Sequence, residues 1–290
     1  MTLQGDFMKF KKLFELSDDE FRRIVGIKKD TFCFLLVELK SSWDARRRAG
    51  GPKPKLRLED QLLLALSYWR NYGTYLETGA KYGVSESCAF YICRWVENTL
   101  IKRKALRLPG KKELILSDEK YKVVVFDVTE CPIERPKRKK NGRRKNRQRQ
   151  YYSGKKKRHT IKEQIVVDQK TGKVIATSQD KGKTHDFKIF KKSKSHVHTK
   201  TKIQGDSGYQ GIQKIHCNSE LPKKRSKKNP LTAEDKKRNR EISSQRVIVE
   251  NVFAFIKKFK IISQKYRNRR KRFGLRFNLI CALFNYEWNE

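Results

Sequence analysis

The feature that most constrains the fold is an abrupt change of sequence pattern at Pro109-Gly110, inside a linker-like segment at 101–118. Before this point apolar residues recur with a helical period. After it comes KVVVFDVT at 122–129, an apolar, β-branched run typical of a buried strand. Strands followed by helices predict a mixed α/β domain over residues 116–290, preceded by an all-α domain over residues 1–115.

The all-α domain contains a helix-turn-helix pattern at about residues 59–100. A short helix ends at Gly83, Ser85 is placed to cap the next helix, and Gly79 lies where two helices would approach closely. This is the plan of DNA-binding helix-turn-helix domains, in which we expect Ser85 and Ser87 to contact DNA. An ordinary helical hairpin with no DNA role is the alternative.

The rest of the α/β domain shows clear local signals. EQIVVDQKTGKVIATSQ at 163–179 predicts two strands joined by a turn, and THDFKIF at 184–190 predicts a short helix. A long helix is expected at about 236–262 and a final helix at about 273–288. No internal repeat is evident.

Net charge indicates the partner. The chain has 71 Lys and Arg against 31 Asp and Glu, a formal charge of +40. Such a charge opposes compaction unless a polyanion compensates it, which favours nucleic acid as the partner. A basic insertion spans about 136–158, another basic stretch spans 221–240, and the expected contacts to the DNA backbone are Lys155, Lys156, Lys157, Arg158 and Lys162.

Location follows from what the sequence lacks. No apolar run approaches the roughly 18–20 residues of a membrane span, and the first residues do not resemble a signal peptide. We therefore expect no membrane partner and a cytoplasmic, nucleoid-associated protein with reduced thiols. A zinc site is a weaker hypothesis, because its candidate ligands lack the close paired spacing of structural sites; they are His196, His198, His216 and Cys217.

Three acidic residues have contexts that suggest chemistry. Asp127 ends a buried run, where a carboxylate costs desolvation energy unless it is paired or binds a cation. Asp206 follows a short apolar strand in IQGDSGYQG, whose glycines leave room for a close ligand. Glu250 shares a helical face with Arg246 and Lys257. Taken singly, these are also ordinary strand-end, turn and surface-pair positions.

Together, the three carboxylates suggest a metal site. Two adjacent strand ends and a facing helix can hold two divalent cations about 4 Å apart, as in-line phosphodiester displacement requires. Mg²⁺ suits such a site, because few carboxylates hold it together with waters and phosphate oxygens.

At this point the sequence resembles bacterial insertion-sequence transposases of the DDE superfamily, and more narrowly the insertion-sequence-five group. The resemblance covers about 120–288, and the upstream helix-turn-helix fits the family's N-terminal half. The family pattern Tyr-x2-Arg-x3-Glu-x6-Lys is matched at Arg246, Glu250 and Lys257, but Ser243 stands at the tyrosine position. The matching text is FDVTECPIERP, YYSGKKKRHTIKEQIVVD, THDFKIF, GDSGYQG and RVIVENVFAFIKKFK.

The resemblance implies a ribonuclease H-like catalytic fold with Asp127, Asp206 and Glu250 as the DDE triad. It further implies two Mg²⁺ ions per site, with Mn²⁺ as a substitute. The implied activity is cleavage at the terminal inverted repeats of an element and joining of 3′ ends to target double-stranded DNA. A homodimer or higher oligomer is expected in the synaptic complex.

Several further residues have open roles. Arg246 and Lys257 either neutralise phosphates beside the metals or pair with Glu250. Asp186 either adds a fourth acid or caps the helix that begins there, and capping is the favoured prediction. Tyr209 stacks on a base or is an ordinary exposed loop residue.

Three other functions compete with transposition. A nuclease of the same fold would cleave without joining, and a decayed or domesticated copy would bind DNA without catalysis. A basic structural RNA-binding protein explains the charge but not the three acids in their contexts.

Overall fold

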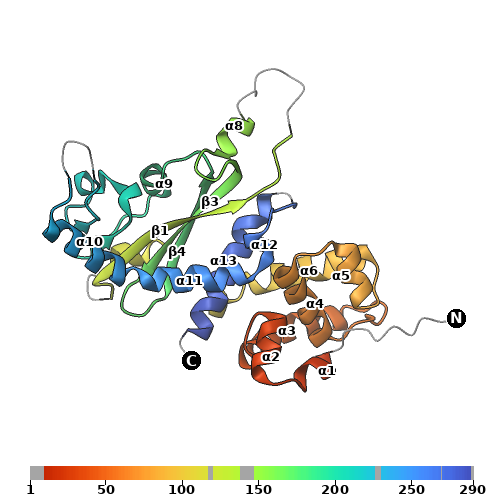
Figure 1. Cartoon of the computed structure of the whole chain (residues 1–290). Coiled ribbons are helices and arrows are strands. Elements are labelled where there is room, and N and C mark those ends of the chain that lie inside the picture. The colour runs from red at the N-terminus through yellow and green to blue at the C-terminus, as the bar shows by residue number, and fades with distance from the viewer. Residues whose placement is uncertain (1–9, 117–119, 138–146, 226–229, 269, 289–290) are drawn as a thin grey trace. The chain divides into compact units, whose positions relative to one another are not determined.

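The computed structural model describes residues 10–116, 120–137, 147–225, 230–268 and 270–288, which form two compact units (Figure 1). A helical unit comprises the described parts of Met1–Arg107, Lys257–Gln264 and Lys271–Glu290. A second unit, which contains the sheet, comprises those of Leu108–Ile256 and Lys265–Arg270. Part of the basic insertion, at 138–146, lies outside the described residues.

The helical unit packs around large apolar side chains such as Phe21, Phe32, Trp69 and Phe277, all of which are fully buried. No helix in the described ranges is both long and apolar enough to cross a membrane. The helices are α1 (Phe10–Phe14), α2 (Asp18–Val25), α3 (Lys29–Arg48), α4 (Leu58–Asn71), α5 (Tyr75–Lys81), α6 (Glu86–Leu100), η1 (Lys104–Leu106), α12 (Lys260–Ser263) and α13 (Phe273–Glu287).

A buried ionic cluster joins α13 to the N-terminal helices. The carboxylate of Glu97 on α6 accepts hydrogen bonds from Trp69 Nε1 at 3.1 Å, Arg272 Nε at 2.6 Å and Arg276 Nε at 2.7 Å. The side chains of Glu97 and Arg276 are at most 1% exposed, so each charge depends on the other for compensation. Helical periodicity cannot show this pairing, which groups the C-terminal helix with residues far away in the sequence.

We predict that Glu97→Gln destabilises the protein by on the order of 3–5 kcal/mol, because it leaves the Arg276 guanidinium buried without a counter-charge. The measurement is urea unfolding followed by far-UV circular dichroism. The control is Asp44→Asn, which breaks the exposed Lys40–Asp44 pair (3.1 Å) and should cost less than about 1 kcal/mol. Equal costs for the two variants would contradict this account.

The second unit is built on a mixed sheet with strand order β2-β3-β1-β5-β6, in which β4 also pairs with β3. β1 pairs antiparallel with β3 and parallel with β5, which confirms the predicted mixed-sheet α/β domain after an all-α domain. The strands are β1 (Val123–Pro132), β2 (Tyr152–Ser153), β3 (Arg158–Asp168), β4 (Val174–Lys181), β5 (Lys202–Gln204) and β6 (Ser219–Glu220).

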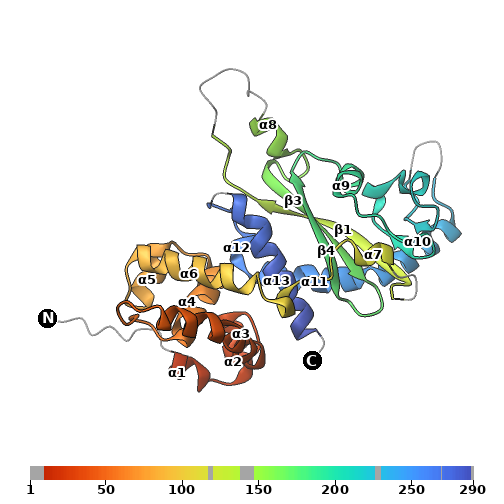
Figure 2. The same ribbon diagram turned by 180° about the vertical axis from the view of Figure 1, so that it is seen from behind.

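Helices cover the sheet. The helical elements here are α7 (Glu113–Leu116), α8 (Arg147–Tyr151), α9 (Asp186–Ser193), η3 (Ser207–Tyr209), η4 (Ile212–Lys214), α10 (Ala233–Gln245) and α11 (Val247–Lys258). One core contains Leu114 of α7, Phe190 of α9 and Tyr209 of η3, packed on Phe126 and Val166 of the strands. Figure 1 shows α11 on the near side of the sheet, and Figure 2 shows α7 in front from the opposite side.

The single long helix expected at 236–262 is wrong. The helix is interrupted at Arg246, which separates α10 from α11. The interruption coincides with two side chains that reach the sheet: Gln245 Oε1 accepts a hydrogen bond from Gln204 Nε2 at 2.5 Å, and Arg246 contacts Asp127. These long-range contacts override the local helical preference.

Glu163 is an unpaired acid inside the sheet. It lies on β3 opposite Thr129, its side chain is buried, and its Oε1 has no hydrogen-bond partner among the described residues. Burial raises the pKa of Glu163 to about 8, so this carboxyl group keeps its proton in the folded state at neutral pH.

This shift makes stability depend on pH. Because the folded-state pKa of Glu163 lies above its unfolded value, its contribution is fully present below the unfolded pKa and is lost as pH rises toward about 8. The loss is roughly 1.4 kcal/mol per pH unit within this window.

Between about pH 5.5 and 7.5, the wild type should therefore lose roughly 2–3 kcal/mol that Glu163→Gln does not lose. Urea unfolding at the two pH values tests this, with the difference between the two proteins as the readout. Identical pH dependence in both would show that Glu163 titrates normally in the folded state.

Candidate functional site

Asp127 and Asp206 occupy equivalent positions on neighbouring parallel strands. The last registered pair of β1 and β5 is Val125 with Gln204, and each aspartate lies two residues beyond its member of that pair. Asp127 does not end its strand as the sequence predicted, because β1 continues to Pro132, whereas Asp206 follows the last residue of β5. The parallel register nevertheless sets the two aspartates side by side at the level where β5 ends.

Asp127 is held by two contacts. Its Oδ1 accepts a hydrogen bond from the Val128 amide at 2.7 Å, and its Oδ2 accepts one from the Arg246 guanidinium at 3.0 Å. Burial raises the pKa of Asp127 to about 6, opposed by Arg246 and the Val128 amide and reinforced by the negative charges of Asp206 and Asp186. A half-buried carboxylate with two acidic neighbours is an environment that attracts a cation.

Asp206 begins the short η3 turn, and its Oδ1 accepts a hydrogen bond from the Gly208 amide at 2.9 Å. A Cβ atom at Gly208 would lie 2.9 Å from that oxygen and 2.8 Å from Oδ2 of Asp186. Asp206 and Asp186 therefore converge on one glycine from different elements.

Asp186 lies outside the predicted triad, and the structure brings it to this place. It is the first residue of α9, and His185 rather than Asp186 occupies the cap position, which corrects the capping prediction. Its Oδ1 accepts a hydrogen bond from Lys162 Nζ at 2.8 Å. The sequence shows only that Asp186 lies at the start of a helix. The fold shows that its side chain lies beside Gly208.

Tyr209 is fully buried, so both sequence expectations for it, stacking on a base and an exposed loop residue, are wrong. Its ring packs near Phe126 and its hydroxyl donates to Gln164 Oε1 at 3.3 Å. Burial, with Asp127 and the other two aspartates nearby, raises its pKa. Tyr209 therefore belongs to the hydrophobic core next to the carboxylates.

Glu250 lies in the first turn of α11 with an exposed side chain. Within the described residues, no three His, Cys, Asp or Glu side chains are already arranged around a metal position. Arg246 pairs with Asp127, and no ion pair with Glu250 occurs among the described side chains. The role of Glu250 as third ligand stays a prediction, as do the roles of the exposed Lys257 and Ser243.

The donor set fits a hard divalent cation at Asp127 and Asp206. Both are half-buried carboxylates, and oxygen donors of this kind suit Mg²⁺ or Mn²⁺. The glycine at 208 leaves open the space between two carboxylate oxygens that a side chain would fill.

The predicted backbone-binding cations fall into two groups. Lys155, Lys156 and Lys157 lie in the turn that joins β2 to β3, and they are exposed together with Arg158. Lys162 is different, since its side chain is only 12% exposed and its ammonium is paired with Asp186. A phosphate contact by Lys162 would require that pair to open.

His159 packs beside this turn. It is half-buried and its ring lies edge-on to Tyr152 at a centroid distance of 5.6 Å. Burial, reinforced by the charge of Arg135, lowers its pKa. His159 is therefore a strand residue packed against Tyr152.

The helix-turn-helix consists of α4, α5 and α6, with α5 and α6 joined by a tight turn. Gly83 has φ of +68°, in the left-handed region, and a Cβ at Gly79 would lie 2.6 Å from the Val84 carbonyl oxygen. The predicted turn and close approach are therefore confirmed. Ser85 caps α6 by accepting a hydrogen bond from the Cys88 amide at 3.3 Å, so its hydroxyl already has a structural role.

The outward face of α6 contains the predicted Ser87 together with three residues that sequence reasoning missed. Ser87 is exposed, Tyr91 is 68% exposed, Arg94 is half-exposed and Asn98 is exposed. Their spacing of four, three and four residues places them on one face of the helix. An exposed, polar and aromatic stripe on the second helix of this motif is the surface that enters a major groove in such domains.

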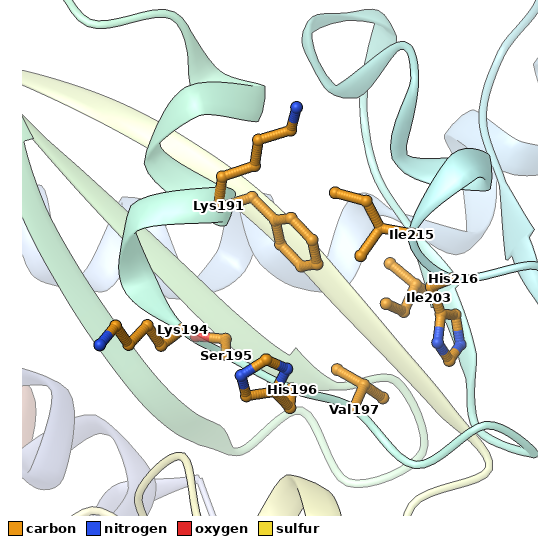
Figure 3. Close-up of a pocket in the computed structure, with 9 residues that line it drawn as sticks. Lys191, Lys194, Ser195, His196, Val197, Ile203, Ile215 and His216 are labelled. Atoms are coloured by element: carbon orange, nitrogen blue, oxygen red, sulfur yellow. The ribbon is translucent and has the colours of Figure 1, made fainter.

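The zinc hypothesis is not supported. His196 and His216 line a cavity of about 200 Å³ beside α9 and β5 (Figure 3), but His216 Nε2 contacts the Thr201 carbonyl oxygen at 2.7 Å. Across the described ranges, no set of three potential ligands is arranged to bind a metal.

Comparison with known proteins agrees with this geometry. A family model described as the DDE superfamily endonuclease matches residues 126–285, and one described as the helix-turn-helix of that superfamily matches residues 54–104. The chain is 42% identical over 280 residues to the probable transposase for insertion sequence element IS702 of Microchaete diplosiphon, covering 97% of this chain and 98% of that protein. No solved structure matches. With one aspartate within β1, a second just after the neighbouring β5, and a helix-turn-helix before them, the chain belongs to the DDE superfamily of endonucleases, among the insertion-sequence transposases.

Proposed function

We propose that the protein binds the terminal inverted repeats of its own element, cleaves phosphodiester bonds at the element ends, and joins the freed 3′ ends to target DNA. Divalent cations, Mg²⁺ or Mn²⁺, would serve both steps in one site. Asp127 and Asp206 are the ligands that the geometry supports best, and Glu250 is the third ligand predicted from the family pattern.

The observation that carries this proposal is the shared register of Asp127 and Asp206. The two carboxylates lie at the same level of neighbouring parallel strands. They supply the oxygen ligands that hold the divalent cations used in phosphodiester cleavage. When bound, a pair of cations activates water for attack on the phosphate and stabilises the leaving oxygen. The chain itself contributes the position of the ligands and the shape of the surrounding site.

Arg246 has a second function in this proposal. It neutralises Asp127 at 3.0 Å, while its Nε has no hydrogen-bond partner among the described residues. A cation at Asp127 would take over that neutralisation. The guanidinium would then present its donors to a phosphate oxygen of the DNA, an interaction that arginine makes well.

DNA binding would be divided between two surfaces. The outward face of α6 would read base edges through Ser87, Tyr91 and Arg94. The cationic turn between β2 and β3 would contact phosphates without regard to sequence.

Finer assignments belong to the same proposal. The spacing of Arg246, Glu250 and Lys257 supports membership of the insertion-sequence-five group. Joining two element ends to one target requires a homodimer or a higher oligomer in the synaptic complex. Its substrate would place the protein in the bacterial cytoplasm, at the nucleoid.

We predict that Asp127→Asn and Asp206→Asn each lower Mg²⁺-dependent cleavage of the element's own ends by roughly 10³-fold or more, which corresponds to about 4 kcal/mol. The measurement is single-turnover cleavage of labelled DNA from the sequence flanking the reading frame. Asp44→Asn is the matched control, because it makes the same substitution at an exposed ion pair of the helical unit, Lys40–Asp44 at 3.1 Å.

Normal Mg²⁺-dependent cleavage by Asp127→Asn would refute the catalytic assignment. A strand-transfer assay with pre-cut ends then separates the remaining functions. Joining supports a transposase, cleavage without joining indicates a nuclease, and specific binding without either reaction indicates an inactive DNA-binding copy.

We further predict that Arg94→Ala weakens binding to the inverted repeat by about 1–3 kcal/mol while binding to unrelated DNA changes less. Fluorescence anisotropy at several salt concentrations measures both. Lys40→Ala, on α3, is the control for losing one exposed cation of the helical unit. An equal loss for specific and unrelated DNA would assign Arg94 to phosphate contact rather than base reading.

A further inference from the structure

We propose that Asp186 is a further cation-facing carboxylate of the catalytic site, acting beside Asp127 and Asp206. This inference rests on the proposed metal-dependent function, and it adds a residue that lies outside the predicted triad. The carboxylates come from three separate elements, the strand β1, the loop after β5 and the start of α9.

The geometry around Gly208 provides the first evidence. Oδ2 of Asp186 and Oδ1 of Asp206 lie 2.8 and 2.9 Å from the point where a Cβ would stand on this residue. Gly208 does not have a positive φ, so its backbone does not itself demand glycine. The carboxylate oxygens of Asp186 and Asp206 occupy the space that a side chain at position 208 would need.

The environment of Asp127 provides the second evidence. Both Asp186 and Asp206 act on Asp127 electrostatically, and all three act on the buried Tyr209 below them. The three carboxylates therefore lie near one another and near the buried ring of Tyr209. Two cationic side chains, Arg246 and Lys162, face three carboxylates there.

Lys162 explains how Asp186 keeps its orientation. The lysine lies on β3, its side chain is 12% exposed, and its ammonium is 2.8 Å from Asp186 Oδ1 and 3.9 Å from Glu130 Oε1. The pair uses one oxygen of Asp186 and leaves Oδ2 beside Gly208. A carboxylate with one oxygen fixed and the other turned toward Asp206 has the arrangement of an oriented ligand.

Glu250 differs from Asp186 in its surroundings. Its side chain is exposed, whereas Asp186 is half-buried beside Gly208, and the charge of Asp186 raises the pKa of Asp127. In the described conformation, Asp186 thus accompanies Asp127 and Asp206.

The test is Mn²⁺ binding to the full-length protein without DNA, measured by electron paramagnetic resonance of free Mn²⁺ and by the Mn²⁺-induced rise in Tm. We expect Asp186→Asn to weaken Mn²⁺ binding at least tenfold and to reduce the Tm rise. Asp44→Asn removes an equal charge from another lysine-paired aspartate, at 3.1 Å from Lys40 on α3, and should bind Mn²⁺ as the wild type does.

Gly208→Ala provides a second variant that changes no charge. Its added methyl group must push the Asp186 and Asp206 oxygens apart, so we expect Mn²⁺ binding to weaken tenfold or more. If Asp186→Asn loses the native circular dichroism spectrum, Asp186→Glu replaces it, with the same expected direction because the carboxylate moves by one methylene.

The outcomes separate this proposal from the proposed function. Wild-type Mn²⁺ affinity in Asp186→Asn, alongside lost affinity in Asp127→Asn, overturns the role of Asp186 and leaves the metal site intact. An equal loss in Asp44→Asn and Asp186→Asn also overturns it, since general charge would then explain the effect. Absence of Mn²⁺ binding in the wild type would instead remove the metal basis of the proposed function.

Discussion

Strand β1 hydrogen-bonds to a neighbouring strand along each of its two edges, and the architecture of the second unit depends on this pairing. Its antiparallel partner β3 and its parallel partner β5 fix the register of the strand, and a shift by one residue would turn Asp127 to the other face. The same pairing determines where the chain leaves β5, and hence where Asp206 begins its turn. The site is therefore a consequence of backbone hydrogen bonds formed well inside the sheet.

Electrostatic compensation then decides how the acids are tolerated. Asp127 is neutralised by Arg246, Asp186 by Lys162 and Glu97 by Arg272 and Arg276, so these three carboxylates each have a cationic partner. Glu163 has no partner among the described residues, and it keeps its proton instead. In a chain so rich in cations, the few arginines and lysines that pair with buried acids serve the fold, whereas the exposed ones are available to DNA.

Local patterns predicted much of the fold. The β-branched run around Asp127, the hairpin of β3 and β4, the cap at Ser85 and the close approach at Gly79 depend on neighbours within a few residues. An acid within or just after an apolar run is visible in a single sequence, and the structure brings Asp127 and Asp206 near each other. Their role as metal ligands stays a prediction.

The predictions that were wrong concern features that depend on contacts between residues far apart in the sequence. The interruption at Arg246 coincides with a contact from Arg246 to Asp127, 119 positions away, and one from Gln245 to Gln204, 41 positions away. No glycine or proline marks it. The burial of Tyr209 depends on how the loop after β5 folds onto the core, and the orientation of Asp186 depends on Lys162. Such contacts leave no trace in periodicity or spacing.

The ionic cluster at Glu97 also has a consequence for synthesis of the protein. The N-terminal helices, which include the DNA-reading motif, leave the ribosome long before α13 supplies Arg276, and before Glu287 accepts its hydrogen bond from the Lys28 amide at 2.6 Å. Until then Glu97 lacks the two arginines that compensate its charge in the folded unit. Full charge compensation around the helix-turn-helix therefore requires the C-terminal helix, and we expect a chain that ends before α13 to have a destabilised helical unit.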